Sequence, residues 1–151
     1  MDETAARQIL VNWFKKKGYE VIEDEIMPGG NEIDLLAFKG LGDRWLVEVK
    51  GEDYSRTESY QVDFDTAMGQ LMKSVLTLES GFRYAVCIPY SRTERGERLS
   101  YRRVLHQYRE SMVFEALHIS LIIIREDQSV EVIAPKDVRS FLQKIDPEIR
   151  V

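Results

Sequence analysis

The stretch NEIDLLAFKGLGDRWLVEVK, residues 31–50, is the most informative part of the chain. Its two halves are rich in strand-forming residues, and the glycine-rich segment between them is typical of a hairpin turn. A hairpin centred near Leu41 sets Asp34 opposite the segment from Glu48 to Lys50. Because side chains alternate between strand faces, Glu48 and Lys50 point to the same side. The sequence therefore predicts two carboxylates and an ammonium close together, at the end of the hairpin away from its turn.

These ionisable groups share their strand faces with apolar side chains. Asp34 alternates in step with Leu36 and Phe38, and Glu48 in step with Leu46. An ion pair on a solvent-facing sheet would be the simpler explanation, but such pairs are common and contribute little, and the apolar neighbours indicate a covered face. Charges on a covered face are costly unless they are paired. We infer that a divalent metal ion is the missing partner.

Composition narrows the class of protein. The chain has 151 residues and a net charge of −5, so we expect one domain over residues 1–151 that does not simply coat nucleic acid. An enzyme that acts on nucleic acid remains compatible, because local charge matters there. No apolar run approaches the ~20 residues of a membrane span, and the acidic N-terminus does not resemble a signal peptide. The single cysteine, Cys87, excludes an internal disulfide and a thiolate zinc site. We expect a cytoplasmic protein.

Hydrophobic periodicity predicts alternating helices and strands. Helices are expected at residues 3–17, 63–78 and 101–117 and from Pro135 onward, and strands at residues 19–26, 31–38, 44–50, 82–88, 118–125 and 130–133. The order α-β-β-β-α-β-α-β-β-α is typical of an α/β fold with a mixed central sheet and helices on both faces.

One aspartate, thirteen intervening residues and a Glu-x-Lys strand follow a leading helix here. This arrangement resembles the PD-(D/E)xK nucleases, which have the restriction-endonuclease-like fold. The likeness is greatest to small bacterial endonuclease-like and archaeal junction-resolvase-like members, and it covers about residues 3–75. Ile33 stands where the nominal proline of the motif would be, a departure that is common in the superfamily.

The resemblance implies a Mg²⁺ or Mn²⁺ site and a set of catalytic residues. Carboxylate and carbonyl oxygens suit these hard ions. Carried over by position, the metal ligands are Asp34, Glu48 and the backbone carbonyl of Val49, and the catalytic residues are Asp34, Glu48, Lys50, Gln70 and Glu3. Lys50 would either activate the attacking water or neutralise charge on the phosphate.

The expected activity is metal-dependent hydrolysis of phosphodiester bonds in DNA. No base-reading module is visible, so strong sequence readout by this chain alone is not expected. Phosphate contacts are expected from Lys73, from the arginines of residues 92–103 and from the lysines of residues 15–17. A homodimer is one further hypothesis. The alternative is a non-catalytic or regulatory module of the same fold, an accessory subunit in a DNA-processing complex.

Overall fold

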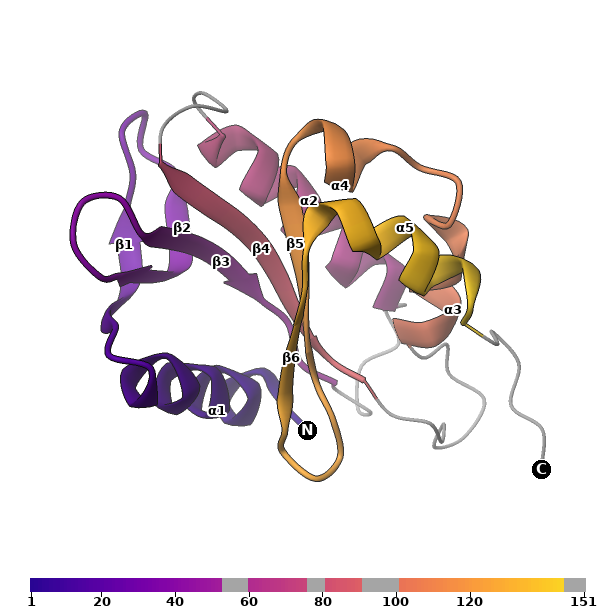
Figure 1. The fold of residues 1–151 in the computed structure, drawn as a ribbon, viewed down its shortest axis with the longest axis horizontal. Coiled ribbons are helices and arrows are strands. Elements are labelled where there is room, and N and C mark those ends of the chain that lie inside the picture. The colour runs from indigo at the N-terminus through magenta and orange to yellow at the C-terminus, as the bar shows by residue number, and fades with distance from the viewer. Residues whose placement is uncertain (53–59, 76–80, 91–100, 146–151) are drawn as a thin grey trace.

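A computed structural model describes residues 1–52, 60–75, 81–90 and 101–145. Its elements, in chain order, are α1 (Glu3–Lys16), β1 (Glu20–Ile26), β2 (Glu32–Phe38), β3 (Arg44–Val49), α2 (Tyr60–Ser74), β4 (Phe82–Pro89), α3 (Tyr101–Gln107), α4 (Val113–Ala116), β5 (Ile119–Ile124), β6 (Val130–Ile133) and α5 (Pro135–Gln143). Figure 1 shows these elements around one central sheet.

The six strands form one mixed sheet in the order β1-β2-β3-β4-β5-β6. β1, β2 and β3 make an antiparallel meander, β3, β4 and β5 are parallel, and β6 returns antiparallel to β5. Parallel neighbours require crossover connections. α2 supplies the first crossover, and α3 with α4 supplies the second. The α/β class and the mixed sheet predicted from the sequence are therefore confirmed.

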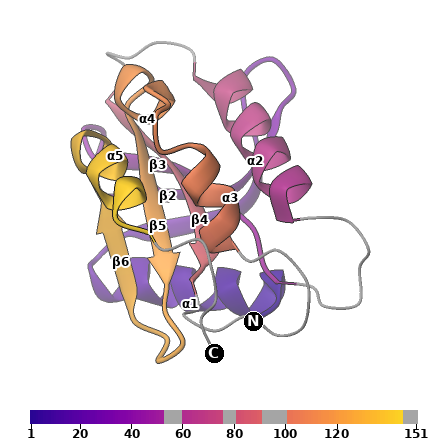
Figure 2. The ribbon, with the colours of Figure 1, turned by 90° about the vertical axis from the view of Figure 1, so that its right-hand side faces the viewer.

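Helices cover both faces of the sheet. α1 lies against one face, and α2, α3, α4 and α5 lie on the other, as the two perpendicular views show (Figures 1 and 2). Each face has its own apolar cluster of buried side chains. The central strands are consequently buried on both sides: every residue of β5 is buried. Cys87, in β4, is also fully buried.

Helix α1 has clear start and stop signals. Asp2 is its N-cap, and the Asp2 carboxylate accepts a hydrogen bond of 2.7 Å from the backbone N–H of Ala5. Gly18 follows the helix with φ of 89°, a conformation that favours glycine. Leu10 and Phe14 are fully buried against the sheet. These contacts fix the position of the N-terminal turn of α1 beside the end of β3.

The structure corrects one predicted helix. Residues 101–117 form two short helices, α3 and α4, because residues 108–110 make a turn after Gln107 and the Ser111 hydroxyl accepts a hydrogen bond from the Val113 N–H. α2 begins at Tyr60, three residues earlier than predicted. Most of the polar loop expected before α2, the end of the helix predicted to Leu78, and Arg92, Arg95 and Arg98 lie outside the described residues.

In the described part of the chain, no helix is both long and apolar enough to span a membrane.

Candidate active site

The hairpin of β2 and β3 stops pairing just before the two acids. The last ladder pair is Leu35 with Val47, and the same register continued by one residue sets Asp34 opposite Glu48. Instead of a main-chain pair, the Asp34 carboxylate accepts a hydrogen bond from the backbone N–H of Val49, with 2.8 Å between Oδ2 and N. The side chain of Asp34 is thereby held in the opening where the two strands separate.

Glu48 is an acid in a nearly closed environment. Its side chain is only 1% exposed, and burial raises its pKa well above the ordinary range. A hydrogen bond with the Asp34 carboxylate and the negative charge of Asp34 raise this pKa further, while the positive charge of Lys50 opposes the shift. The two carboxyl groups are therefore in contact. Among the described residues, Glu48 Oε1 has no hydrogen-bond partner.

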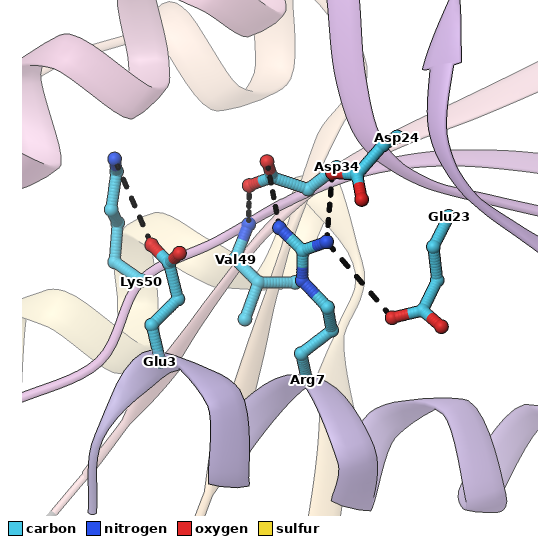
Figure 3. Close-up of polar contacts among 7 residues, drawn as sticks. All are labelled: Glu3, Arg7, Glu23, Asp24, Asp34, Val49 and Lys50. Atoms are coloured by element: carbon cyan, nitrogen blue, oxygen red, sulfur yellow. Dashed lines mark hydrogen bonds and ion pairs between the residues drawn. The ribbon is translucent and has the colours of Figure 1, made fainter.

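Lys50 and Glu3 meet at the edge of this acid pair. The distance from Lys50 Nζ to Glu3 Oε1 is 4.0 Å (Figure 3). Glu3 reaches this position because the first turn of α1 packs directly on Gly51. A Cβ on Gly51 would lie 2.0 Å from the Glu3 nitrogen, so only glycine allows this approach. The Tyr101 hydroxyl donates a hydrogen bond of 2.8 Å to the Gly51 carbonyl from the other side of the sheet.

Arg7 also enters the site, and the sequence pattern alone does not single it out. It follows Glu3 by one helical turn, so both side chains leave the same face of α1. Arg7 Nη2 is 3.2 Å from Asp34 Oδ1, and Nη1 is 2.8 Å from Asp24 Oδ1 and 3.9 Å from Glu23 Oε1 (Figure 3). The feature of the sequence that could have indicated Arg7 as a site residue is its spacing of one helical turn from Glu3.

Asp24 is held in an unusual conformation next to this contact. Its φ is 55°, a region that aspartate enters more readily than most residues. In the β1–β2 register it falls directly across from Asp34. Like charges opposite one another destabilise a sheet. The Arg7 guanidinium offsets this repulsion, because it forms an ion pair with each of the Asp24 and Asp34 carboxylates.

Gln70 is the remaining expected site residue. Gln70 is exposed on α2, and its backbone carbonyl accepts a hydrogen bond from the Ser74 hydroxyl. Within the described ranges, no hydrogen bond or ion pair joins the Gln70 side chain to Asp34, Glu48, Lys50 or Glu3. Contacts within the described residues therefore link Asp34, Glu48, Lys50 and Glu3, and none of these contacts includes the Gln70 side chain. Lys73 is exposed one turn beyond Gln70.

The chemistry of the donors fits a hard divalent cation. Two touching carboxyl groups, one with a buried oxygen that lacks a hydrogen-bond partner, are better satisfied by a cation than by the hydrogen bond between them. The Val49 carbonyl follows immediately and is an oxygen donor of the same kind. Among the described residues, no group of three or more His, Cys, Asp or Glu side chains is arranged to hold a metal ion. A metal here would depend on two carboxylates, a backbone oxygen and water.

Comparisons with known proteins give no function. No family model matches the chain, and no curated protein matches it. Among solved structures, the chain resembles SPO1766, a protein of unknown function from Silicibacter pomeroyi, with a TM-score of 0.48 and 15% identity over 96% of this chain and 84% of that one. It also resembles the protein of unknown function AF1548, with a TM-score of 0.40 and 16% identity over 76% of this chain and 54% of that one. At these similarities the two structures carry no argument about function.

Proposed function

We propose that this chain is a metal-dependent nuclease with the restriction-endonuclease-like fold, and that it hydrolyses phosphodiester bonds in DNA. One observation carries the proposal. Asp34 and Glu48 touch where β2 and β3 separate, and burial together with Asp34 raises the pKa of Glu48. Lys50 follows Glu48 by two residues, beside the same pair. A buried pair of acids lowers the stability of the fold when no cation is bound. This cost favours a functional role for the pair over a structural one.

Each residue of the site has a part in this proposal. Asp34, Glu48 and the Val49 carbonyl would hold Mg²⁺ or Mn²⁺. When bound, the metal ion polarises a phosphate oxygen and makes a bound water a better nucleophile. Lys50 places a positive charge next to the acids, where it neutralises the phosphate or orients the attacking water. Glu3, at 4.0 Å, holds the Lys50 ammonium in place. The exposed Lys73 would contact the DNA backbone.

The test is cleavage of supercoiled plasmid and of branched DNA in Mn²⁺ by the wild type, Lys50→Ala and Asp34→Ala. We expect nicking by the wild type and a loss of at least about a hundredfold in both variants, because each removes a group that stabilises charge in the transition state. Lys136→Ala removes an exposed lysine of α5, which is not among the expected DNA contacts, and is the matched control. Circular dichroism verifies that all variants fold. Cleavage that persists in Lys50→Ala and Asp34→Ala would rule out this site.

An accessory, non-catalytic module of the same fold is the second candidate. The ion pair between Arg7 and Asp34 favours it, because a protein cation already neutralises one metal ligand. In this candidate, the surface around Arg7 and Asp34 would bind a partner subunit of a DNA-processing complex. This candidate predicts that the purified protein cleaves no form of DNA in Mn²⁺, and that Mn²⁺ leaves the melting temperature of the wild type unchanged relative to chelator.

A further inference from the structure

The Arg7 guanidinium lies beside the carboxylate that the proposed metal ion needs. Its Nη2 atom is 3.2 Å from Asp34 Oδ1, while Asp34 Oδ2 accepts the Val49 N–H. Both oxygens of Asp34 are thus occupied by donors of this chain (Figure 3). The two partners are only 18% and 22% exposed, so water screens their attraction less than at an open surface.

We propose that Arg7 is an internal counter-cation of Asp34, which a divalent metal ion must displace in order to bind. The inference rests on the proposed function, because it concerns the same metal site. A guanidinium and a doubly charged ion at one carboxylate repel each other, and the repulsion is stronger where water is partly excluded. Arg7 therefore lowers the affinity for metal. In the metal-free protein it also shields Asp34 from Asp24, which lies across from it in the sheet.

Displacement does not leave the arginine without a partner. Asp24 Oδ1 is 2.8 Å from Arg7 Nη1, and Glu23 Oε1 is 3.9 Å from the same atom. Both acids are more exposed than Asp34, with exposed fractions of 55% and 49%. Different nitrogens make the two contacts, Nη2 with Asp34 and Nη1 with Asp24, so loss of the first does not require loss of the second. The cluster thus offers two positions for one positive charge, and only one of them blocks the metal.

The experiment measures Mn²⁺ affinity from the electron paramagnetic resonance signal of free Mn²⁺, with no substrate and no turnover. Arg7→Gln removes the charge and keeps a hydrogen-bond donor, whereas Arg7→Lys keeps the charge. Lys15→Gln removes one charge from an exposed position on the same helix. We expect Arg7→Gln to bind Mn²⁺ about tenfold more tightly than the wild type. Arg7→Lys and Lys15→Gln should stay within about twofold of the wild type, because neither removes the charge beside Asp34.

The outcomes separate this inference from the proposed function. If the wild type binds Mn²⁺ and Asp34→Asn abolishes binding, but Arg7→Gln binds no more tightly, then only the role of Arg7 is refuted. If neither the wild type nor Arg7→Gln binds Mn²⁺, the metal site fails and both proposals fall. If Arg7→Gln leaves Asp24 and Asp34 unneutralised and the variant unfolds without metal, the readout becomes recovery of folded protein as Mn²⁺ is added, and absence of recovery overturns the inference.

Discussion

At the scale of single residues, Glu48 combines almost complete burial with a second acid as its neighbour. Burial first, and then Asp34, raises the Glu48 pKa from an ordinary value of 4.5 to about 9. Between these two values the folded protein keeps a proton that the unfolded chain has lost. The folded state therefore binds more protons, and by linkage the stability of the metal-free protein falls as pH rises through this window. The loss levels off above the folded pKa, where both states are ionised.

Glu48→Gln tests this linkage, because glutamine has nearly the same shape and does not ionise. We expect the variant to gain stability over the wild type as pH rises from about 5 to 9, by on the order of a few kcal/mol at the upper end. Urea denaturation in chelator at several pH values measures the difference. Saturating Mn²⁺ should flatten the pH dependence of the wild type only, since a bound metal ion takes the place of the proton on Glu48. A difference in stability that is constant with pH would mean that Glu48 is ionised in the folded protein.

At the scale of elements, the contact between Gly51 and the first turn of α1 joins the helix to the end of β3. A methyl group on Gly51 would lie 2.0 Å from the Glu3 nitrogen and 2.3 Å from the Asp2 carbonyl carbon. These are backbone atoms, so neither can move without displacing the helix. We expect Gly51→Ala to cost about 3 kcal/mol of stability, measured by urea denaturation.

Gly69→Ala is the matched control for this prediction. Gly69 lies inside α2, and nothing lies within 4 Å of the position of its added Cβ. Alanine is the better helix former, so this variant should gain about 0.5 to 1 kcal/mol. The same glycine-to-alanine substitution is therefore expected to lower stability at position 51 and to raise it at position 69. If Gly51→Ala is neutral as well, α1 is not held against residue 51 in solution.

The same elements show what could be predicted from the sequence. The hairpin of β2 and β3, and with it the meeting of Asp34 and Glu48, follows from local signals: a glycine-rich turn and alternation along each strand. The break between α3 and α4 was missed because residues 108–112 contain no glycine or proline to mark it. Arg7 and Gly51 act through the packing of α1 on the sheet. That packing is a tertiary feature, which periodicity along one segment does not reveal.

At the scale of the whole molecule, one sheet separates two apolar layers that share no buried side chain among the described residues. The α1 layer includes Leu10, and the layer of α2 to α5 includes Leu71. The strands connect the layers, because neighbouring residues of one strand point into different ones: Leu46 into the second and Val47 into the first. The acids of the candidate site lie on β2 and β3, and Glu3 and Arg7 lie on α1. The site therefore depends on both layers being folded at once.

This coupling predicts that a destabilising substitution in one layer also lowers the stability of the other layer. Both tryptophans of the chain, Trp13 and Trp45, pack in the α1 layer, whereas most of the helix seen by far-ultraviolet circular dichroism lies in the other. We expect Leu71→Ala, in the layer without tryptophan, to cost about 2 to 5 kcal/mol and to shift the fluorescence and dichroism transitions together.

Leu41→Ala is the control, because Leu41 is 87% exposed at the hairpin tip and should shift neither transition. A Leu71→Ala protein whose dichroism transition moves while its fluorescence transition stays in place would show layers that unfold separately, and α1 could then leave the acid pair without unfolding the rest.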